Sequence, residues 1–197
     1  MNRYLLFAIA LVLAITGCRK SKTESASSQS DQTKIVACSL ISNDEVQKIQ
    51  GSPVKDTKPS ESADSSFRIS QCFYSTEVFN KSVSLAVTQR NPDSTSARDP
   101  KTFWKETFGR YQGVVKEQEG DEEKKKSLGE EEEERGQPPK KIEGVGDDAW
   151  WTANRMGGAL YVLKNNVFIR VSVGGPGSQE DKIEQSKALA AKALSRL

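Results

Sequence analysis

The N-terminal residues most constrain what this chain folds into. A single arginine precedes an unbroken apolar run over residues 4–15, and Thr16, Gly17 and Cys18 follow the run directly. A positive start, an apolar middle and a small-residue end are typical of a secretory signal peptide. The run holds 12 residues, whereas a membrane-spanning helix needs about 20. We therefore expect residues 1–17 to be a signal peptide, so that the rest of the chain folds outside the cytoplasm.

The residues around the end of the run carry a more specific signal. Ile15-Thr16-Gly17-Cys18 resembles the lipobox of bacterial lipoproteins, in which an aliphatic residue and two small residues precede a cysteine. The resemblance implies that the Cys18 thiol is acylated, that the signal peptide is cut before it and that the new amino group is acylated too. Stable anchoring needs more than one acyl chain, and such a group meets that condition. The alternative is an ordinary secretory signal with an unrelated cysteine.

A polar segment, residues 19–34, follows the predicted anchor and has no apolar side chain larger than that of Ala26. Such a segment cannot bury enough surface to offset the entropy lost on folding. We expect a disordered tether over residues 18–34, between the membrane and a folded domain. Position 19 is arginine rather than the aspartate that signals inner-membrane retention, which favours the outer membrane in a cell that has two membranes.

The charge balance and the absence of histidine narrow the function classes. There are 29 Lys and Arg against 27 Asp and Glu, so no strong basic excess suggests a nucleic-acid partner. The chain has no histidine, which removes the usual general base of neutral pH and every nucleophile–histidine pair. We expect no cofactor and no enzyme activity, with carboxylate-based hydrolysis as the alternative.

The cysteine count agrees with export. If Cys18 is acylated, Cys38 and Cys72 remain as one pair in an oxidising compartment. A disulfide between them would stabilise the fold by about 3 to 4 kcal/mol in the chain-entropy model. It would also remove the thiolate ligands of a zinc site, so no metal is expected. The alternative is two buried free thiols.

The first half of the domain, which we expect to span residues 35–197, shows clear local signals. Ser42 and Glu45 form a capping box before a short helix that ends at Gly51. A loop rich in Ser, Asp and Pro follows, up to about residue 66. Alternation of apolar and polar residues then predicts two antiparallel strands, at residues 67–75 and 82–89.

The second half adds further elements. Asp99 and Pro100 open a helix whose aromatic face we interpret as core packing: Phe103, Trp104, Phe108 and Tyr111. Two more strands are joined across Asn165-Asn166, a dipeptide that suits a tight turn. Ser178 caps a final helix. The order of elements predicts an α+β domain, with an antiparallel sheet of about five strands and the helices packed on one face.

Residues 116–141 interrupt this pattern with dense charge. They have almost no apolar side chain and contain five consecutive glutamates at positions 130–134. Blocks of like charge are usually solvated, so we interpret the segment as an inserted loop. A site for a cation or a basic partner is the alternative.

Two groups of motifs resemble a family of secreted bacterial lipoproteins of unknown function. The first is Cys-Ser-Leu-Ile at residues 38–41 with Gln-Cys-Phe-Tyr at residues 71–74, and the second is a Gly-x-Gly-Asp-x-Ala turn at residues 144–149 before an aromatic strand. Extracellular sensor domains of bacterial receptor kinases are similar in broad layout. The resemblance covers about residues 38–197, and it implies a disulfide-pinned α+β domain with no established activity.

The same turn supplies the candidate site residues. Asp147 and Asp148 suit either a turn, in which they accept backbone hydrogen bonds, or carboxylate chemistry. Neighbours in a strand point to opposite faces, so at most one of Trp150 and Trp151 enters the core facing the helices. The other should lie on the open face, where it can stack on a sugar, a peptide or a protein, although plain covering of the sheet is the favoured interpretation. We expect a membrane-anchored, non-catalytic binding or accessory module for an envelope protein or polymer.

Overall fold

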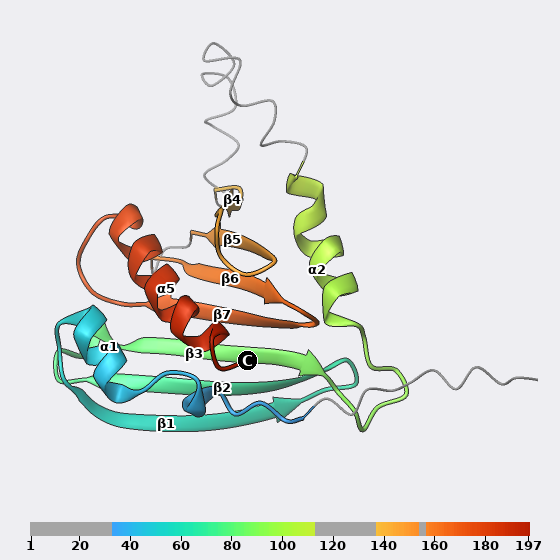
Figure 1. Cartoon of the computed structure of the whole chain (residues 1–197), viewed down its shortest axis with the longest axis horizontal. Helices are drawn as coiled ribbons and strands as arrows, with labels where there is room; N and C mark the ends of the chain where they lie inside the picture. Colours follow the sequence, from blue (N-terminus) through green and yellow to red (C-terminus); the bar gives the residue numbers. More distant parts are fainter. Residues whose placement is uncertain (1–32, 113–136, 154–156) are drawn as a thin grey trace, which may run out of the picture. The chain divides into compact units, whose positions relative to one another are not determined.

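The computed structural model describes residues 33–112, 137–153 and 157–197 (Figure 1). The predicted signal peptide, Cys18, nearly all of the tether and most of the charged insertion lie outside the described residues, so these stay predictions. Within the described part of the chain, none of the helices has the length and apolar character needed to cross a bilayer.

Seven strands form one antiparallel sheet in the order β1-β2-β3-β7-β6-β5-β4. They are β1 (Val54–Ala63), β2 (Phe67–Thr76), β3 (Val83–Arg90), β4 (Lys140–Lys141), β5 (Asp148–Thr152), β6 (Ala159–Lys164) and β7 (Val167–Val173). Two meanders, β1 to β3 and β5 to β7, meet where β3 pairs with β7. The predicted α+β class is confirmed, but the sheet has seven strands within the described residues rather than about five.

Both additional strands lie at the edges of the sheet. β1 occupies the stretch predicted as a loop, and nearly all of its residues are exposed. It therefore lacks the alternation that marks a half-buried strand, and backbone pairing with β2 holds it in place. Its Pro59 is tolerated because an edge strand has one unpaired side. β4 lies within the predicted insertion and pairs with β5, so that insertion is shorter than expected at its C-terminal end.

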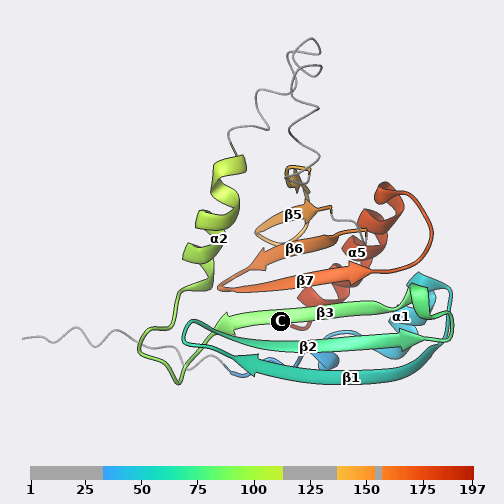
Figure 2. The same cartoon turned by 180° about the vertical axis from the view of Figure 1, so that it is seen from behind.

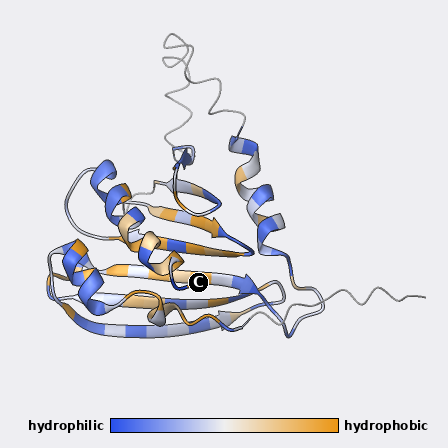
Figure 3. Ribbon diagram, viewed as in Figure 1, coloured by the Kyte–Doolittle hydropathy of each residue, from blue (hydrophilic) through white to orange (hydrophobic). Residues whose placement is uncertain are grey.

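Two helices cover one face of the sheet. α1 (Asn43–Gln50) and α5 (Gln179–Leu194) lie in front of the strands in Figure 1 and behind them in Figure 2. Each begins with a capping box, Ser42 with Glu45 and Ser178 with Asp181. The main core lies between these helices and the central strands, where Figure 3 shows apolar residues, whereas β1 is mostly hydrophilic.

The predicted disulfide is present. Cys38 in the short 3-10 helix η1 (Ala37–Ser39) is bonded to Cys72 in β2. Close by, the hydroxyl of Tyr74 donates a hydrogen bond to the carbonyl of Ile41 at 2.8 Å. Burial raises the pKa of this tyrosine to about 12. These contacts attach the N-terminal segment of the domain to the sheet.

The third helix contradicts the prediction that all helices share one face. α2 (Pro100–Phe108) and the 3-10 turn η3 (Gly109–Tyr111) pack on the opposite face, over β5, β6 and β7. The reason lies in those strands, which carry large apolar side chains on both faces: Trp150 and Phe168 on one, Trp151 and Ile169 on the other. A sheet with two apolar faces must be covered on both.

Candidate functional site

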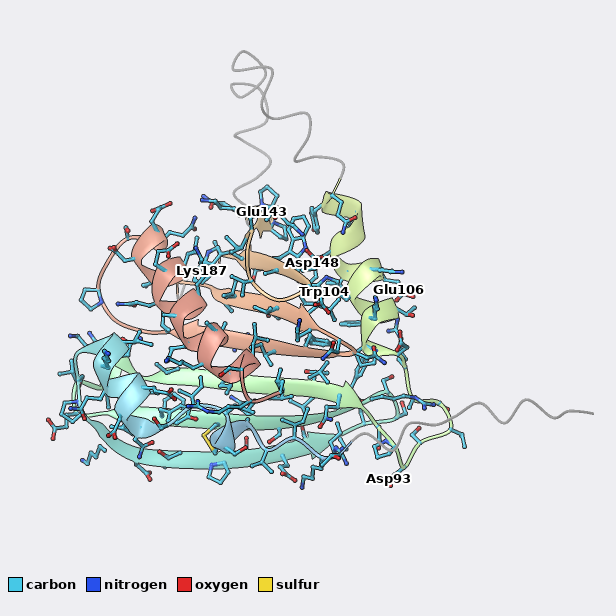
Figure 4. The ribbon with its side chains drawn as sticks, viewed as in Figure 1. Asp93, Trp104, Glu106, Glu143, Asp148 and Lys187 are labelled. Atoms are coloured by element: carbon cyan, nitrogen blue, oxygen red, sulfur yellow. A yellow bond between two sulfur atoms is a disulfide. The ribbon has the colours of Figure 1, made fainter. Side chains whose placement is uncertain are left out.

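Asp148, at the start of β5, is the point at which α2, β4 and β5 meet. The indole Nε1 of Trp104 donates to its Oδ2 at 2.7 Å, and the indole Nε1 of Trp150 donates to the same oxygen at 3.2 Å. The ammonium of Lys141 binds its Oδ1, and the carboxylate side chain is only 13% exposed. Figure 4 shows Trp104 and Asp148 facing each other between α2 and the sheet. The carboxylate is therefore engaged by three side chains.

Asp147 makes a separate set of contacts at the β6–β7 turn. It accepts the backbone N–H of Asn165 at 2.6 Å, and the ammonium of Lys164 lies 3.1 Å from its other oxygen. Asn165 has a φ of 55°, the left-handed conformation that such a tight turn needs. Burial acts to raise the pKa of Asp147, but these hydrogen bonds outweigh it and hold the pKa below its usual value. Of the two alternatives for Asp147, a turn or carboxylate chemistry, this contact fits the turn.

The two aspartates do not share a site, because Asp147 binds the β6–β7 turn and Asp148 binds α2 and β4. Within residues 33–112, 137–153 and 157–197, no three cysteine or carboxylate side chains are gathered as they would be to hold a metal ion. The contacts of Asp147 and Asp148 therefore support the fold.

Both tryptophans of the candidate surface are buried. Their side chains do point to opposite faces, Trp151 into the main core and Trp150 into the cluster under α2. Trp150 is 0% and Trp151 1% exposed, so the expectation that one indole lies on an open face is wrong. The cause is α2, whose Phe108 ring lies parallel to the Trp150 indole at a centroid distance of 5.8 Å. Neither indole is available for stacking on a ligand.

A groove of about 370 Å³ runs along the boundary between α2 and the sheet, and we call it the α2 groove. Its volume lies near the lower end of the range of small-molecule sites. Most of its lining is aromatic: Phe103, Trp104, Phe108, Tyr111, Tyr161 and Phe168. Concave shape and aromatic lining make it a candidate binding site.

Comparison with known proteins gives no further guidance. No protein-family model, no curated protein and no solved structure matches the chain. The resemblance to secreted lipoproteins and to sensor domains therefore stays a prediction. Function has to be inferred from the chemistry of the α2 groove and from the sequence.

The polar side chains of the α2 groove are one guanidinium, which only donates, and three hydroxyls, which can donate and accept. The hydroxyl of Tyr161 accepts from Nε of Arg170 at 3.2 Å, which leaves its own proton to donate. Arg110 lies over the ring of Tyr111 at 4.9 Å, and its guanidinium makes no ion pair with another described residue. Thr152 adds a hydroxyl at one end of the groove. The groove thus combines aromatic surface with donors and positive charge.

The sequence predicts helix α2, but it does not predict that α2 lines a groove. Trp104 and Phe108 do pack in a core, as predicted, yet the partly buried Phe103 and Tyr111 line the groove. Lys141 was assigned to a solvated loop, whereas it binds Asp148. A signal was available in β7, because its residues on the α2 side, Phe168, Arg170 and Ser172, are aromatic or polar rather than aliphatic.

Proposed function

We propose that the chain is a lipid-anchored lipoprotein of the bacterial envelope that acts as a non-catalytic binding or accessory module. In this proposal an envelope protein or polymer docks in the α2 groove. The groove itself carries the proposal, because an aromatic concave surface with convergent polar groups is the usual form of a binding site.

The anchor part of the proposal rests on sequence. The signal peptide and the lipobox-like residues before Cys18 support acylation, and the disulfide between Cys38 and Cys72 fits an oxidising compartment. Replacing Cys18 with alanine should abolish fatty-acid labelling and move the protein out of the membrane fraction. Membrane retention that is unchanged in Cys18→Ala would contradict acylation at this residue.

A carboxylate-based hydrolase of an envelope polymer, the alternative from the sequence, has less support. A general acid or base must reach the proton that it transfers in the bound substrate. Asp148 is held by two indoles and an ammonium, and Asp147 by a backbone N–H and Lys164. Turnover of an envelope polymer that is lost in Asp147→Asn or Asp148→Asn, with the fold intact, would favour the hydrolase.

The docking proposal is tested by filling the groove. Thr107 lines it from α2, whereas Lys105 on the same helix is exposed and lies outside it. The full-length acylated protein is isolated from intact envelopes as wild type, Thr107→Trp and Lys105→Trp, and the co-purified partners are compared. We expect Thr107→Trp to lose capture by about tenfold, a difference of about 1.4 kcal/mol, while Lys105→Trp retains it.

Thermal unfolding of each variant shows whether α2 is still in place. If Thr107→Trp is unfolded, Tyr111→Ala takes its place, because Tyr111 lines the same groove and is only partly buried. Equal capture by a folded groove variant and by Lys105→Trp would show that the partner binds elsewhere.

A further inference from the structure

The aromatic lining of the α2 groove comes from two sides. Phe103 and Tyr111 contribute from the helix side, and Tyr161 and Phe168 contribute from the sheet. The rings of Phe103 and Phe168 are stacked with centroids 6.0 Å apart. Aromatic-lined grooves are a recurring way to bind proline-rich segments, because the polyproline II helix is preformed and loses little entropy on binding. The chain's own Pro139 already forms part of the wall of this groove.

The hydrogen-bonding groups of the groove favour a run of prolines over an ordinary extended peptide. Tyr161, Thr152 and Arg110 all offer donors, and Arg110 offers no acceptor. A run of prolines presents carbonyl acceptors and has no backbone N–H. An ordinary extended peptide would bring N–H groups for which the lining side chains offer only the hydroxyl oxygens of Thr107, Thr152 and Tyr161, and each donor left unpaired on burial is costly.

Among the described residues that line the groove, the only charged side chain is the positive one of Arg110. The guanidinium of Arg170 lies 5.9 Å from the ring of Tyr161, one of the lining residues. The neighbouring carboxylate of Asp148 is neutralised by Lys141. An acidic residue beside the bound segment would therefore be attracted, with a strength that falls as salt is added.

From these three observations we infer that the α2 groove binds a proline-rich segment of an envelope protein, flanked by acidic residues. The inference rests on the proposed function and names its ligand class. The proline rings pack on Tyr111, Tyr161 and Phe103, the carbonyl oxygens accept from Tyr161 and Arg110, and the acidic flank faces Arg110 and Arg170.

The probe is a synthetic peptide in which a short run of prolines is followed by glutamates. Two matched peptides replace the prolines with a Gly-Ser run or the glutamates with lysines. The peptides are titrated into the full-length acylated protein in detergent micelles, and the indole N–H signals are followed by NMR. Trp104 lines the groove and reports binding, while Trp151 on the other side of the sheet is an internal control.

We expect the proline–glutamate peptide to shift the Trp104 signal and to leave the Trp151 signal in place. It should bind at least about tenfold more tightly than the Gly-Ser peptide, and more tightly than the lysine peptide at low salt. Tyr161→Phe keeps the ring and removes only the donor hydroxyl, so we expect binding several-fold weaker without loss of the fold. Lys105→Ala should bind as the wild type does.

Three results overturn the inference: equal binding of the proline and Gly-Ser peptides, an unmoved Trp104 signal, or a Tyr161→Phe variant that binds as the wild type does. If the peptides fail but an envelope glycan is captured by the wild type and lost in Thr107→Trp, the proposed function stands and only the ligand class is wrong. If Thr107→Trp and Lys105→Trp capture the same envelope partners alike, docking in the α2 groove fails as well.

Discussion

The carboxylate of Asp148 holds α2 against the sheet through contacts with three side chains. It accepts from Trp104 and Trp150 and binds Lys141, and it is nearly buried. Hydrogen bonds to charged groups contribute about 1.5 to 3 kcal/mol each. The position of α2, and with it the shape of the α2 groove, therefore depends on this residue.

Replacing Asp148 with asparagine tests this dependence. The variant keeps the size of the side chain but loses the charge, which leaves Lys141 without its partner beside the Trp150 ring. We expect the free energy of unfolding to fall by about 2 to 4 kcal/mol, measured by urea denaturation. Asp147→Asn is the control, because its ion pair with Lys164 is largely exposed and should contribute less than about 1 kcal/mol. Equal losses in the two variants would contradict the role of Asp148.

The sequence indicated Asp148 but could not indicate its partners. Its place in the ordered Gly-x-Gly-Asp-x-Ala turn marked it as a carboxylate with a defined position. Trp104 lies 44 residues away along the chain, and Lys141 lies in a segment that looks solvated. Contacts between distant segments are set by the packing of the sheet, which local patterns do not contain.

At the level of elements, the disulfide connects η1 to β2 across 34 residues of chain. In the chain-entropy model, loss of the cross-link in the double variant Cys38→Ser, Cys72→Ser should lower the free energy of unfolding by about 3 to 4 kcal/mol. The loss is measured by urea denaturation in the absence of reductant. Wild-type protein treated with reductant should match the double variant, and a reductant that changes nothing would contradict this expectation.

Two glycines with positive φ provide a second test at this level. A Cβ at Gly158, before β6, would lie 2.5 Å from the Trp151 ring, whereas a Cβ at Gly51, after α1, meets nothing within 4 Å. We expect Gly158→Ala to lower the unfolding temperature far more than Gly51→Ala, which should cost about 1 kcal/mol from backbone strain alone. Differential scanning calorimetry on the two variants gives the comparison. Similar unfolding temperatures would mean that the close approach at Gly158 relaxes without cost.

Elements with local signals could be predicted, and those that depend on a neighbour could not. The caps at Ser42, Asp99 and Ser178 start helices where expected, since capping involves only nearby residues. β1 could not be predicted, because an exposed edge strand owes its conformation to the backbone of β2. α2 packs on the face where β5, β6 and β7 carry a second set of apolar side chains. Which strands lie side by side there depends on the order of strands in the sheet, which local patterns do not contain.

In the whole molecule, the C-terminus closes onto the first helix. The guanidinium of Arg196 donates to both oxygens of Glu45 at 2.8 Å and to the carbonyl of Leu40 at 2.6 Å. Glu45 also accepts the backbone N–H of Ser42 in the capping box. The hydrogen bonds from Arg196 and Ser42 lower the pKa of Glu45 from 4.5 to about 2.

This shift predicts how stability depends on pH. Because the folded pKa of Glu45 lies below its ordinary value, the unfolded chain binds more protons between pH 4.5 and pH 2. The contribution of Glu45 is therefore complete above pH 4.5 and is lost as the pH falls toward 2. Glu45→Gln should be less stable than the wild type at pH 7, and the difference should shrink toward zero near pH 2, as measured by urea denaturation across this range. A difference that is independent of pH would contradict the assignment.

The pairing of β3 with β7 has a consequence for how the domain matures if it is exported as we propose. A chain that crosses a membrane N-terminus first delivers β1, β2 and β3 long before β7, which completes the centre of the sheet. Until then one edge of β3 has no partner strand, and Glu45 lacks Arg196. Folding of the exported domain is therefore complete only after its last residues have emerged.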